Sequence, residues 1–119
     1  MKPKVLIVDD DPATRDMLRL GLEDESYEVF EASSGKQVME LLNAHRPMLV
    51  ILDILMEEQE GIETLREIRR FYPTMPIIMI STDGFYLTLA ERMGANAVLE
   101  KPIDLRQLYK LCKELIANV

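Results

Sequence analysis

Five polar residues of this sequence stand at or directly after the ends of short apolar runs. They are Asp9, Asp10, Asp53, Ser81 and Lys101. A carboxylate can act as a nucleophile or bind a cation, a hydroxyl can donate a hydrogen bond, and a lysine ammonium offsets negative charge. If the fold brings these groups together, they form a site suited to moving an anionic group onto a carboxylate.

The three carboxylates determine what else such a site needs. Two unit charges about 4 Å apart cost roughly 4 kcal/mol at an effective dielectric constant of about 20, so the cluster requires a raised pKa or a bound cation. Ligands that are all oxygen favour a hard ion, which predicts Mg²⁺ or Mn²⁺. With the ammonium of Lys101 and the hydroxyl of Ser81, the set contains what phosphoryl transfer to Asp53 requires.

The elements that would position these residues form a repeated strand–helix pattern. Apolar runs predict strands at 5–8, 27–32, 48–53, 76–81 and 97–100, and apolar residues at helical spacing follow each strand. The helices are expected to begin near residues 12, 34, 61, 84 and 104. The run at 48–53 has no polar residue before Asp53, which indicates a strand buried on both faces of a sheet.

Short crossovers through helices require parallel strands, and right-handed connections place helices on both faces of the sheet. The predicted fold class is therefore α/β, a doubly wound, five-stranded parallel sheet. Two strand orders fit, and one of them is 2-1-3-4-5, which places the second strand at an edge. Ligands gather outside the carboxyl ends of such strands, and that order would cluster the polar ends of strands one, three, four and five.

Local signals indicate where the helices begin and end. Asp11 before a proline is typical of a helix N-cap, and Ser34 with Gln37 has the spacing of a capping box. Gly94 is expected to end the fourth helix. Met17 is expected on the apolar face of the first helix, and the eight methionines are expected to fill the core.

Length and composition limit the class of protein. The chain has 119 residues, enough for one domain with a hydrophobic core. Its formal net charge of −7 argues against a domain that binds nucleic acid by itself, because such binding depends on Lys and Arg. A single cysteine, Cys112, allows no internal disulfide and fits a reducing compartment. No apolar run approaches the roughly 20 residues that span a membrane, so we expect no membrane association and a cytoplasmic location.

The sequence resembles a response-regulator receiver domain of two-component signalling, over essentially all of residues 1–119. The matching pieces are Val8-Asp9-Asp10, Asp53 after its apolar strand, Gly61, Ile80-Ser81, Gly94-Ala95 and Lys101-Pro102. The resemblance implies one receiver domain with a flavodoxin-like (βα)5 fold and strand order 2-1-3-4-5. It also implies a signalling phosphoacceptor, which catalyses only its own phosphorylation and dephosphorylation.

The resemblance assigns the phosphoacceptor role to Asp53 and the phosphodonor role to a phosphohistidine. That phosphohistidine would belong to a sensor histidine kinase or a histidine phosphotransfer protein. Ser81 and Lys101 would hold phosphate oxygens, and the peptide bond before Pro102 would be cis.

The resemblance also implies the ligands of the cation. Asp10 and Asp53 would bind Mg²⁺ (or Mn²⁺) directly, together with the backbone carbonyl of Leu55, and Asp9 would bind it through a water. The surface formed by the fourth helix, the fifth strand and the last helix would contact an output domain or a second copy of the chain. The sequence stops just past the last helix, so no output domain is expected within it.

Three positions depart from the family pattern. Glu57 stands where receivers usually have proline, within an acidic stretch at 57–60. Leu55 replaces a polar side chain that can contact the water that attacks during dephosphorylation, which predicts a long-lived phosphoryl group. Val98 replaces the aromatic residue that often acts as a rotamer switch. We therefore expect the backbone of residues 82–86 to carry the signal as Ser81 closes on phosphate, with an aromatic switch at Phe85 or Tyr86 as the alternative.

Three other functions use similar features. A haloacid-dehalogenase-like phosphatase also has an aspartate nucleophile and Mg²⁺, and Asp9 with Asp11 has its Asp-x-Asp spacing, but 119 residues leave little room for that larger core. Asp11 is expected mainly to cap a helix.

A flavodoxin-like electron carrier would need a phosphate loop rich in Ser, Thr or Gly after the first strand, which the sequence lacks. A pseudo-receiver, which binds partners without phosphorylation, would lack a site residue, and none is missing.

Overall fold

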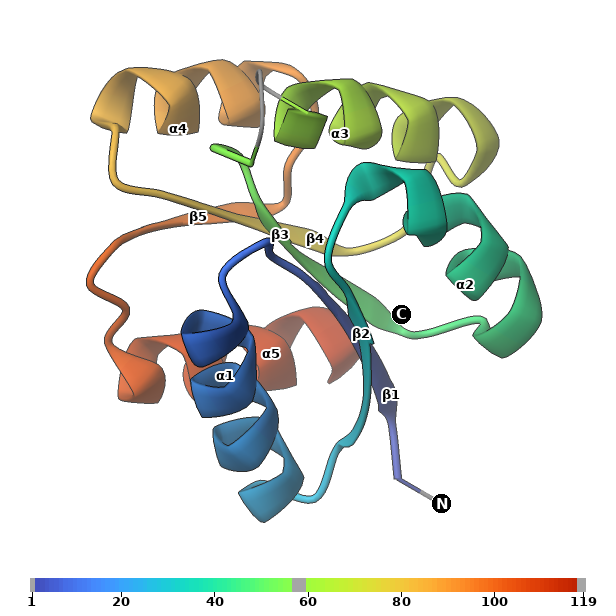
Figure 1. Ribbon diagram of the computed structural model, residues 1–119, viewed down its shortest axis with the longest axis vertical. Helices are drawn as coiled ribbons and strands as arrows, with labels where there is room; N and C mark the ends of the chain where they lie inside the picture. The colour runs from blue at the N-terminus through green and yellow to red at the C-terminus, as the bar shows by residue number, and fades with distance from the viewer. Residues whose placement is uncertain (1, 57–59, 118–119) are drawn as a thin grey trace.

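The computed structural model describes residues 2–56 and 60–117, and at its centre is a parallel sheet of five strands. The strands are β1 (Lys4–Val8), β2 (Glu28–Ala32), β3 (Leu49–Asp53), β4 (Ile77–Ser81) and β5 (Ala97–Glu100). Their spatial order is β2-β1-β3-β4-β5 (Figure 1). The predicted order 2-1-3-4-5 is therefore confirmed, and every neighbouring pair is parallel.

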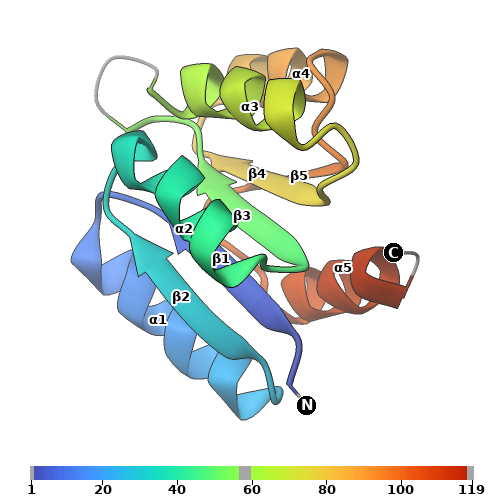
Figure 2. The same ribbon diagram turned by 90° about the vertical axis from the view of Figure 1, so that its right-hand side faces the viewer.

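Helices cover both faces of this sheet. On one face lie α1 (Pro12–Asp24) and α5 (Leu105–Ala117), and on the other lie α2 (Val38–His45), α3 (Glu60–Phe71) and α4 (Gly84–Arg92), as Figure 1 and Figure 2 show. This is the predicted doubly wound arrangement. None of the helices in the described part of the chain has the length and apolarity that a membrane span requires.

The central strand, β3, is buried along its whole length. Its side chains alternate between the two faces of the sheet. Val50 and Leu52 join the apolar core beneath α2, α3 and α4, whereas Leu49 and Ile51 join the core against α1 and α5. Because helices cover both faces, each of these positions needs an apolar side chain, which explains the unbroken run that ends at Asp53.

Parallel pairing brings the carboxyl ends of the strands to one edge of the sheet. β3 ends at Asp53, β4 ends at Ser81, and Asp9 directly follows β1. Ser81 pairs with Glu100 on β5, and the backbone N–H of Lys101 continues this ladder by donating to the Ser81 carbonyl at 2.9 Å. The strand order thus places four of the predicted site residues at the same edge.

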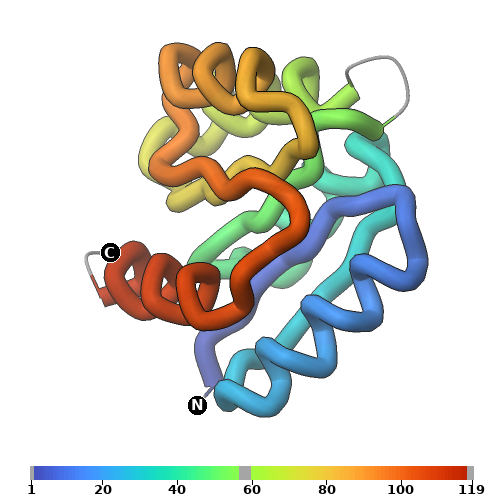
Figure 3. The backbone as a smooth tube through the Cα atoms, turned by 90° about the vertical axis from the view of Figure 1, so that its left-hand side faces the viewer, coloured from blue at the N-terminus to red at the C-terminus, as the bar shows by residue number. Residues whose placement is uncertain are grey.

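Most of the predicted helix ends agree with the structure. The Asp11 carboxylate accepts a hydrogen bond from the backbone N–H of Ala13 at the start of α1, and Gly94, with a φ of 105°, follows the end of α4. A positive φ favours glycine because glycine has no Cβ. Figure 3 shows the backbone running from β5 into α5. The Lys101–Pro102 peptide bond between these elements is cis, as the resemblance implied.

The capping box predicted for Ser34 and Gln37 was wrong. Ser34 makes no side-chain cap, and Gln37 Oε1 accepts instead from the backbone N–H of Ser33 at 2.8 Å. Residues Gly35–Gln37 form a short 3₁₀ helix, η1, so α2 begins only at Val38. The bond from Gln37 therefore ties the end of the β2 segment to η1.

The placement of Met17 in the core was also wrong. α1 buries Leu18 and Leu22, which are four residues apart and lie on the same face of the helix. Met17 is rotated by about 100° from Leu18, and 42% of its surface is exposed. The eight methionines are therefore not all core residues.

Candidate functional site

A lysine lies between two buried carboxylates at the carboxyl edge of the sheet. The Asp9 and Asp53 side chains are 1% and 4% exposed. Lys101 Nζ lies 3.4 Å from Asp9 Oδ2 and 3.3 Å from Asp53 Oδ2. These residues stand at the ends of β1, β3 and β5, so the strand order is what brings them together.

Asp10 adds a third carboxylate to this centre. One oxygen from each of Asp9, Asp10 and Asp53 lies within 4.8 Å of the others, and Asp10 is the exposed member. Three carboxylates and the one ammonium of Lys101 leave two negative charges in excess. An all-oxygen donor set with excess negative charge and access from solvent fits a hard divalent cation.

Burial and neighbouring charges shift the pKa values of Asp53 and Lys101. Burial first, and then the Asp9 carboxylate, raise the pKa of Asp53 to about 6, although Lys101 acts in the opposite direction. Burial would lower the pKa of Lys101, but the Asp53 and Asp9 carboxylates outweigh it, and the pKa is raised. Lys101 therefore stays protonated at neutral pH, and Asp53 is a carboxylate whose ionised form gains from further positive charge.

Ser81 is fully buried at the end of β4. Its Oγ accepts a hydrogen bond from the backbone N–H of Asp83 at 3.0 Å, which leaves the hydroxyl hydrogen available for donation. The Asp83 carboxylate in turn accepts from the backbone N–H of Phe85 at 2.9 Å and caps α4. Two hydrogen bonds thus connect the Ser81 hydroxyl to the first turn of α4.

The segment after β3 packs closely against α3. The backbone N–H of Leu55 donates to Asp53 Oδ1 at 3.3 Å. A β-carbon on Gly61 would collide with the Asp53 carbonyl and the backbone of Ile54, so only glycine permits this approach. The departure predicted at Glu57, where receivers usually have proline, lies outside the described residues, as do positions 58 and 59.

Two residues near the site were not predicted from the sequence. Arg15 of α1 donates from Nη1 to the Asp9 carbonyl at 2.6 Å, and its Nε lies 3.5 Å from Glu31 Oε1. A weak signal existed, because helical side chains point toward the helix N-terminus and an arginine in the first turns can reach the preceding loop. That signal does not predict Glu31 as the partner of Arg15, because Glu31 lies on β2 and its approach depends on the fold.

Asp11, which has the spacing of a phosphatase motif with Asp9, has a different role in this fold. It is exposed, and its carboxylate accepts hydrogen bonds at the start of α1 from Ala13 N–H and from Thr14 Oγ1 at 2.6 Å. The helix-capping prediction for Asp11 is therefore confirmed.

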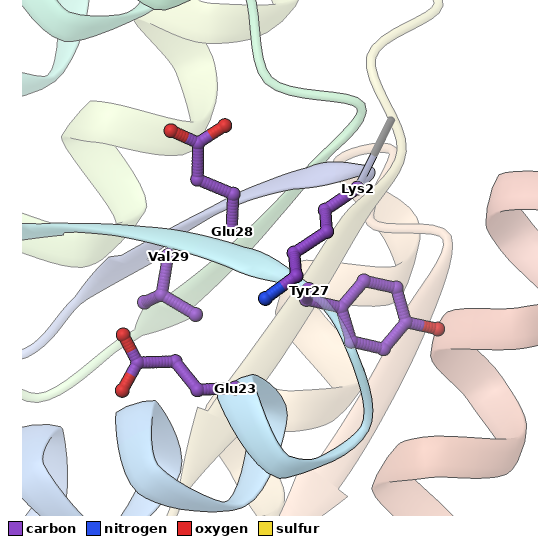
Figure 4. Close-up of a pocket in the computed structure, with 5 residues that line it drawn as sticks. All are labelled: Lys2, Glu23, Tyr27, Glu28 and Val29. Atoms are coloured by element: carbon purple, nitrogen blue, oxygen red, sulfur yellow. The ribbon is translucent and has the colours of Figure 1, made fainter.

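A separate hollow lies at the opposite ends of the strands. Figure 4 shows its lining, which comes from the segments that begin β1 and β2 and from the last turn of α1: Lys2, Glu23, Tyr27, Glu28 and Val29. None of the acidic, serine or lysine residues of the candidate site contributes to this hollow.

Comparison with known proteins identifies close similarities in sequence. Residues 5–113 match the response regulator receiver domain family. A "Probable transcriptional regulatory protein" of Picosynechococcus is 37% identical over 97% of this chain and 49% of its own length. The transcriptional regulatory protein GlrR of Escherichia coli is 36% identical over 89% of this chain and 24% of its own length. The chain thus spans half or less of these two curated relatives.

Solved structures show the same similarity in three dimensions. The receiver domain of NtrX from Brucella abortus has a TM-score of 0.90 and 30% identity, covering 97% of this chain and 99% of that one. A CheY-like response regulator receiver domain protein from Methanospirillum hungatei has a TM-score of 0.90 and 29% identity, covering 99% and 96%. From its sequence match, its strand order and these neighbours, the chain belongs to the response regulator receiver domain family.

Proposed function

We propose that this receiver domain accepts a phosphoryl group on Asp53 and thereby switches a protein–protein interaction surface. The position of Lys101 carries the proposal, because its ammonium bridges the buried Asp9 and Asp53 carboxylates at 3.4 and 3.3 Å. In this position the Lys101 ammonium would face the oxygens of a phosphoryl group bonded to Asp53. Charge placed in advance where negative charge develops is the main means by which proteins promote phosphoryl transfer.

In the proposed step, an Asp53 carboxylate oxygen attacks the phosphorus of a phosphohistidine. The O–P bond forms as the P–N bond breaks, and the electron pair returns to the imidazole nitrogen. The donor would be a sensor histidine kinase or a histidine phosphotransfer protein. Lys101 and the Ser81 hydroxyl would each bind a phosphoryl oxygen. The Ser81 hydroxyl accepts a hydrogen bond and donates none to the residues that the structure describes, which supports that role.

We assign the cation of this site as Mg²⁺ or Mn²⁺. Asp10 and Asp53 would bind it directly, together with the backbone carbonyl of Leu55, and Asp9 would bind it through a water. The cluster of three carboxylate oxygens within 4.8 Å supports this assignment. When bound, such a cation neutralises negative charge on the transferring phosphoryl group.

The output of phosphorylation would begin at Ser81. Its hydrogen bond from Asp83 links the hydroxyl to the cap of α4, so a movement of Ser81 toward phosphate would shift residues 82–86. Val98 is half-buried against the core and carries no aromatic ring, which supports a backbone shift as the carrier of the signal. The face formed by α4, β5 and α5 would then contact an output domain or a second copy, consistent with relatives named as transcriptional regulators.

Incubation with Mg²⁺ and acetyl phosphate, followed by intact-mass measurement, tests the proposal. One added phosphoryl group is expected, and Asp53→Asn or addition of a chelator should abolish it. No mass gain with any phosphodonor would contradict the proposal and favour a pseudo-receiver. Turnover of a phosphate ester would instead favour the phosphatase alternative.

The lifetime of the phosphoryl group is a separate test. The apolar side chain of Leu55, 38% exposed, stands two residues after Asp53 and offers no hydrogen bond to an attacking water. With no phosphatase present, a phosphoryl half-life of hours is expected. A half-life of seconds would contradict this part of the proposal.

A further inference from the structure

Arg15 contacts the backbone of the acidic loop, which we define as residues 9–11. Its Nη1 donates to the Asp9 carbonyl at 2.6 Å, while its Nε lies 3.5 Å from Glu31 Oε1 on β2. Arg19, one turn further along α1, takes the other oxygen of Glu31 at 3.2 Å. Glu31 thus holds Arg15 from β2, and Arg15 holds the loop that follows β1.

These contacts complete the anchoring of Asp9. Its N–H donates to the Ala32 carbonyl at 3.1 Å, its Oδ1 accepts from Asp11 N–H at 2.9 Å, and its Oδ2 faces Lys101 at 3.4 Å. The remaining polar atom, the carbonyl oxygen, is the one that Arg15 binds. That carbonyl belongs to the planar peptide unit that joins Asp9 to Asp10, so Arg15 restricts the rotation of the unit from which Asp10 begins.

We propose that Arg15 is a positioning residue for the Asp10 carboxylate and that Glu31 orients Arg15 for this task. The inference rests on the cation binding of the proposed function. Without a cation, the three carboxylates repel one another, and the exposed Asp10 is the member with room to move away. Holding its peptide unit keeps the carboxylate near Asp9 and Asp53, so less ordering is required when the cation binds.

The chemistry of the guanidinium explains why an arginine occupies this position. Its planar fork fixes the directions of its nitrogens, so that one donates a hydrogen bond to a carbonyl while another forms an ion pair with a carboxylate. A lysine has one ammonium on a flexible stem and would satisfy the two partners poorly. Glu31 also balances the positive charge of Arg15, so the anchor adds little repulsion toward a bound cation.

Calorimetric titration of Mg²⁺ into the metal-free protein tests this inference. Arg15→Met, which keeps an apolar stem and removes the donors, should raise the Kd for Mg²⁺ about tenfold, the usual cost of losing an outer partner of a metal site. Arg15→Lys should recover part of that loss. The matched control is Arg19→Met, which also removes a partner of Glu31 but lies one turn further from Asp9; its Kd should change by less than about twofold.

Hydrogen exchange supplies a readout in the metal-free state. The Asp11 N–H, bonded to Asp9 Oδ1, should exchange faster in Arg15→Met than in Arg19→Met when both variants have equal stability in a chelator. If Arg15→Met does not fold, Arg15→Lys and Glu31→Gln carry the test, with an expected rise in Kd of about threefold for each.

The outcomes separate this inference from the proposed function. An unchanged Kd in Arg15→Met, with Mg²⁺ binding intact in the wild type, would overturn the positioning role alone. Equal weakening in Arg15→Met and Arg19→Met would also overturn it, because the effect would then come from general destabilisation. A wild-type protein that binds no Mg²⁺ would overturn both proposals.

Discussion

Two clusters of ion pairs meet at Asp9, and they differ most in the burial of their carboxylates. The cations differ less, because the Lys101 side chain is 22% exposed and those of Arg15 and Arg19 are 19% and 32% exposed. In the inner cluster, Lys101 pairs with Asp9 and Asp53, whose side chains are 1% and 4% exposed. In the outer cluster, Arg15 and Arg19 of α1 pair with Glu31 of β2, and these side chains are 19–32% exposed. In both clusters basic side chains pair with carboxylates, at N···O distances between 3.2 and 3.5 Å.

The comparison indicates that burial, more than ion pairing, sets the pKa of a carboxylate in this molecule. Desolvation, followed by repulsion from the Asp9 carboxylate, raises the pKa of Asp53 to about 6 in the inner cluster. Buried charges of this kind cost stability and occur most often at functional sites. Ion pairs near the surface contribute little to stability because solvent screens them. The outer cluster therefore matters mainly through what it holds in place, the backbone of Asp9.

Removing the ammonium of Lys101 from the inner cluster should have the largest effect, on the rate of phosphorylation. Lys101→Met is expected to slow phosphorylation by acetyl phosphate about 100-fold or more, since it removes charge that stabilises the transferring group. Intact-mass time courses with Mg²⁺ would measure the rate. A matched surface variant, Lys110→Met on α5, should react like the wild type, and an equal rate for Lys101→Met would contradict the proposed role.

The second prediction concerns the pH dependence of the metal-free protein. The folded pKa of Asp53, about 6, lies above the reference value of 3.8, so between those values the folded state holds a proton that the unfolded state releases. The free energy of unfolding should therefore fall as pH rises through this window. At neutral pH, Asp53→Asn should be more stable than the wild type by about 1 kcal/mol, a value reduced for screening by nearby solvent.

Urea denaturation in a chelator, at several pH values from acid to neutral, would measure this difference. The wild type and Asp53→Asn should converge in stability at the acid end, where Asp53 is protonated in both states. Parallel pH profiles for the two proteins would show that ionisation of Asp53 does not lower the stability of the folded state.

Breaking the outer cluster should change stability much less. Glu31→Gln removes the carboxylate that Arg15 and Arg19 share and should lower the free energy of unfolding by about 0.5 kcal/mol. Asp16→Asn, which removes only the more exposed pair with Arg19, should have an effect near zero. A loss of several kcal/mol in Glu31→Gln would mean that the outer cluster is itself a stabilising network.

The smallest expected effect is that of salt. At about 1 M ionic strength the screening length falls to roughly 3 Å, so the small contribution of the outer cluster should disappear. The stability difference between Glu31→Gln and the wild type should therefore shrink as salt is added. A salt-independent difference would show that Glu31 acts by packing or hydrogen bonding, with charge unimportant.

Much of the fold could be predicted because its signals are local. The apolar run that ends at Asp53 predicted a strand buried on both faces, and the structure places β3 at the centre of the sheet. The cap at Asp11 and the positive φ of Gly94 also follow from single residues and their neighbours. Local signals failed where two neighbours compete, as when Gln37 bonds Ser33 instead of Ser34.

Local sequence patterns were sufficient to assign the order of strands and helices and the residue type at each strand end, because hydrophobic periodicity and turn residues act over a few positions. The predicted strand order indicated that the polar strand ends would cluster, but the individual contacts between them depend on the tertiary structure. Lys101 meets Asp9 and Asp53 from 92 and 48 residues away, and Arg15 reaches the Asp9 carbonyl while Glu31 holds it. Such contacts depend on how whole elements pack and where long side chains then point, and no short stretch of sequence contains that information.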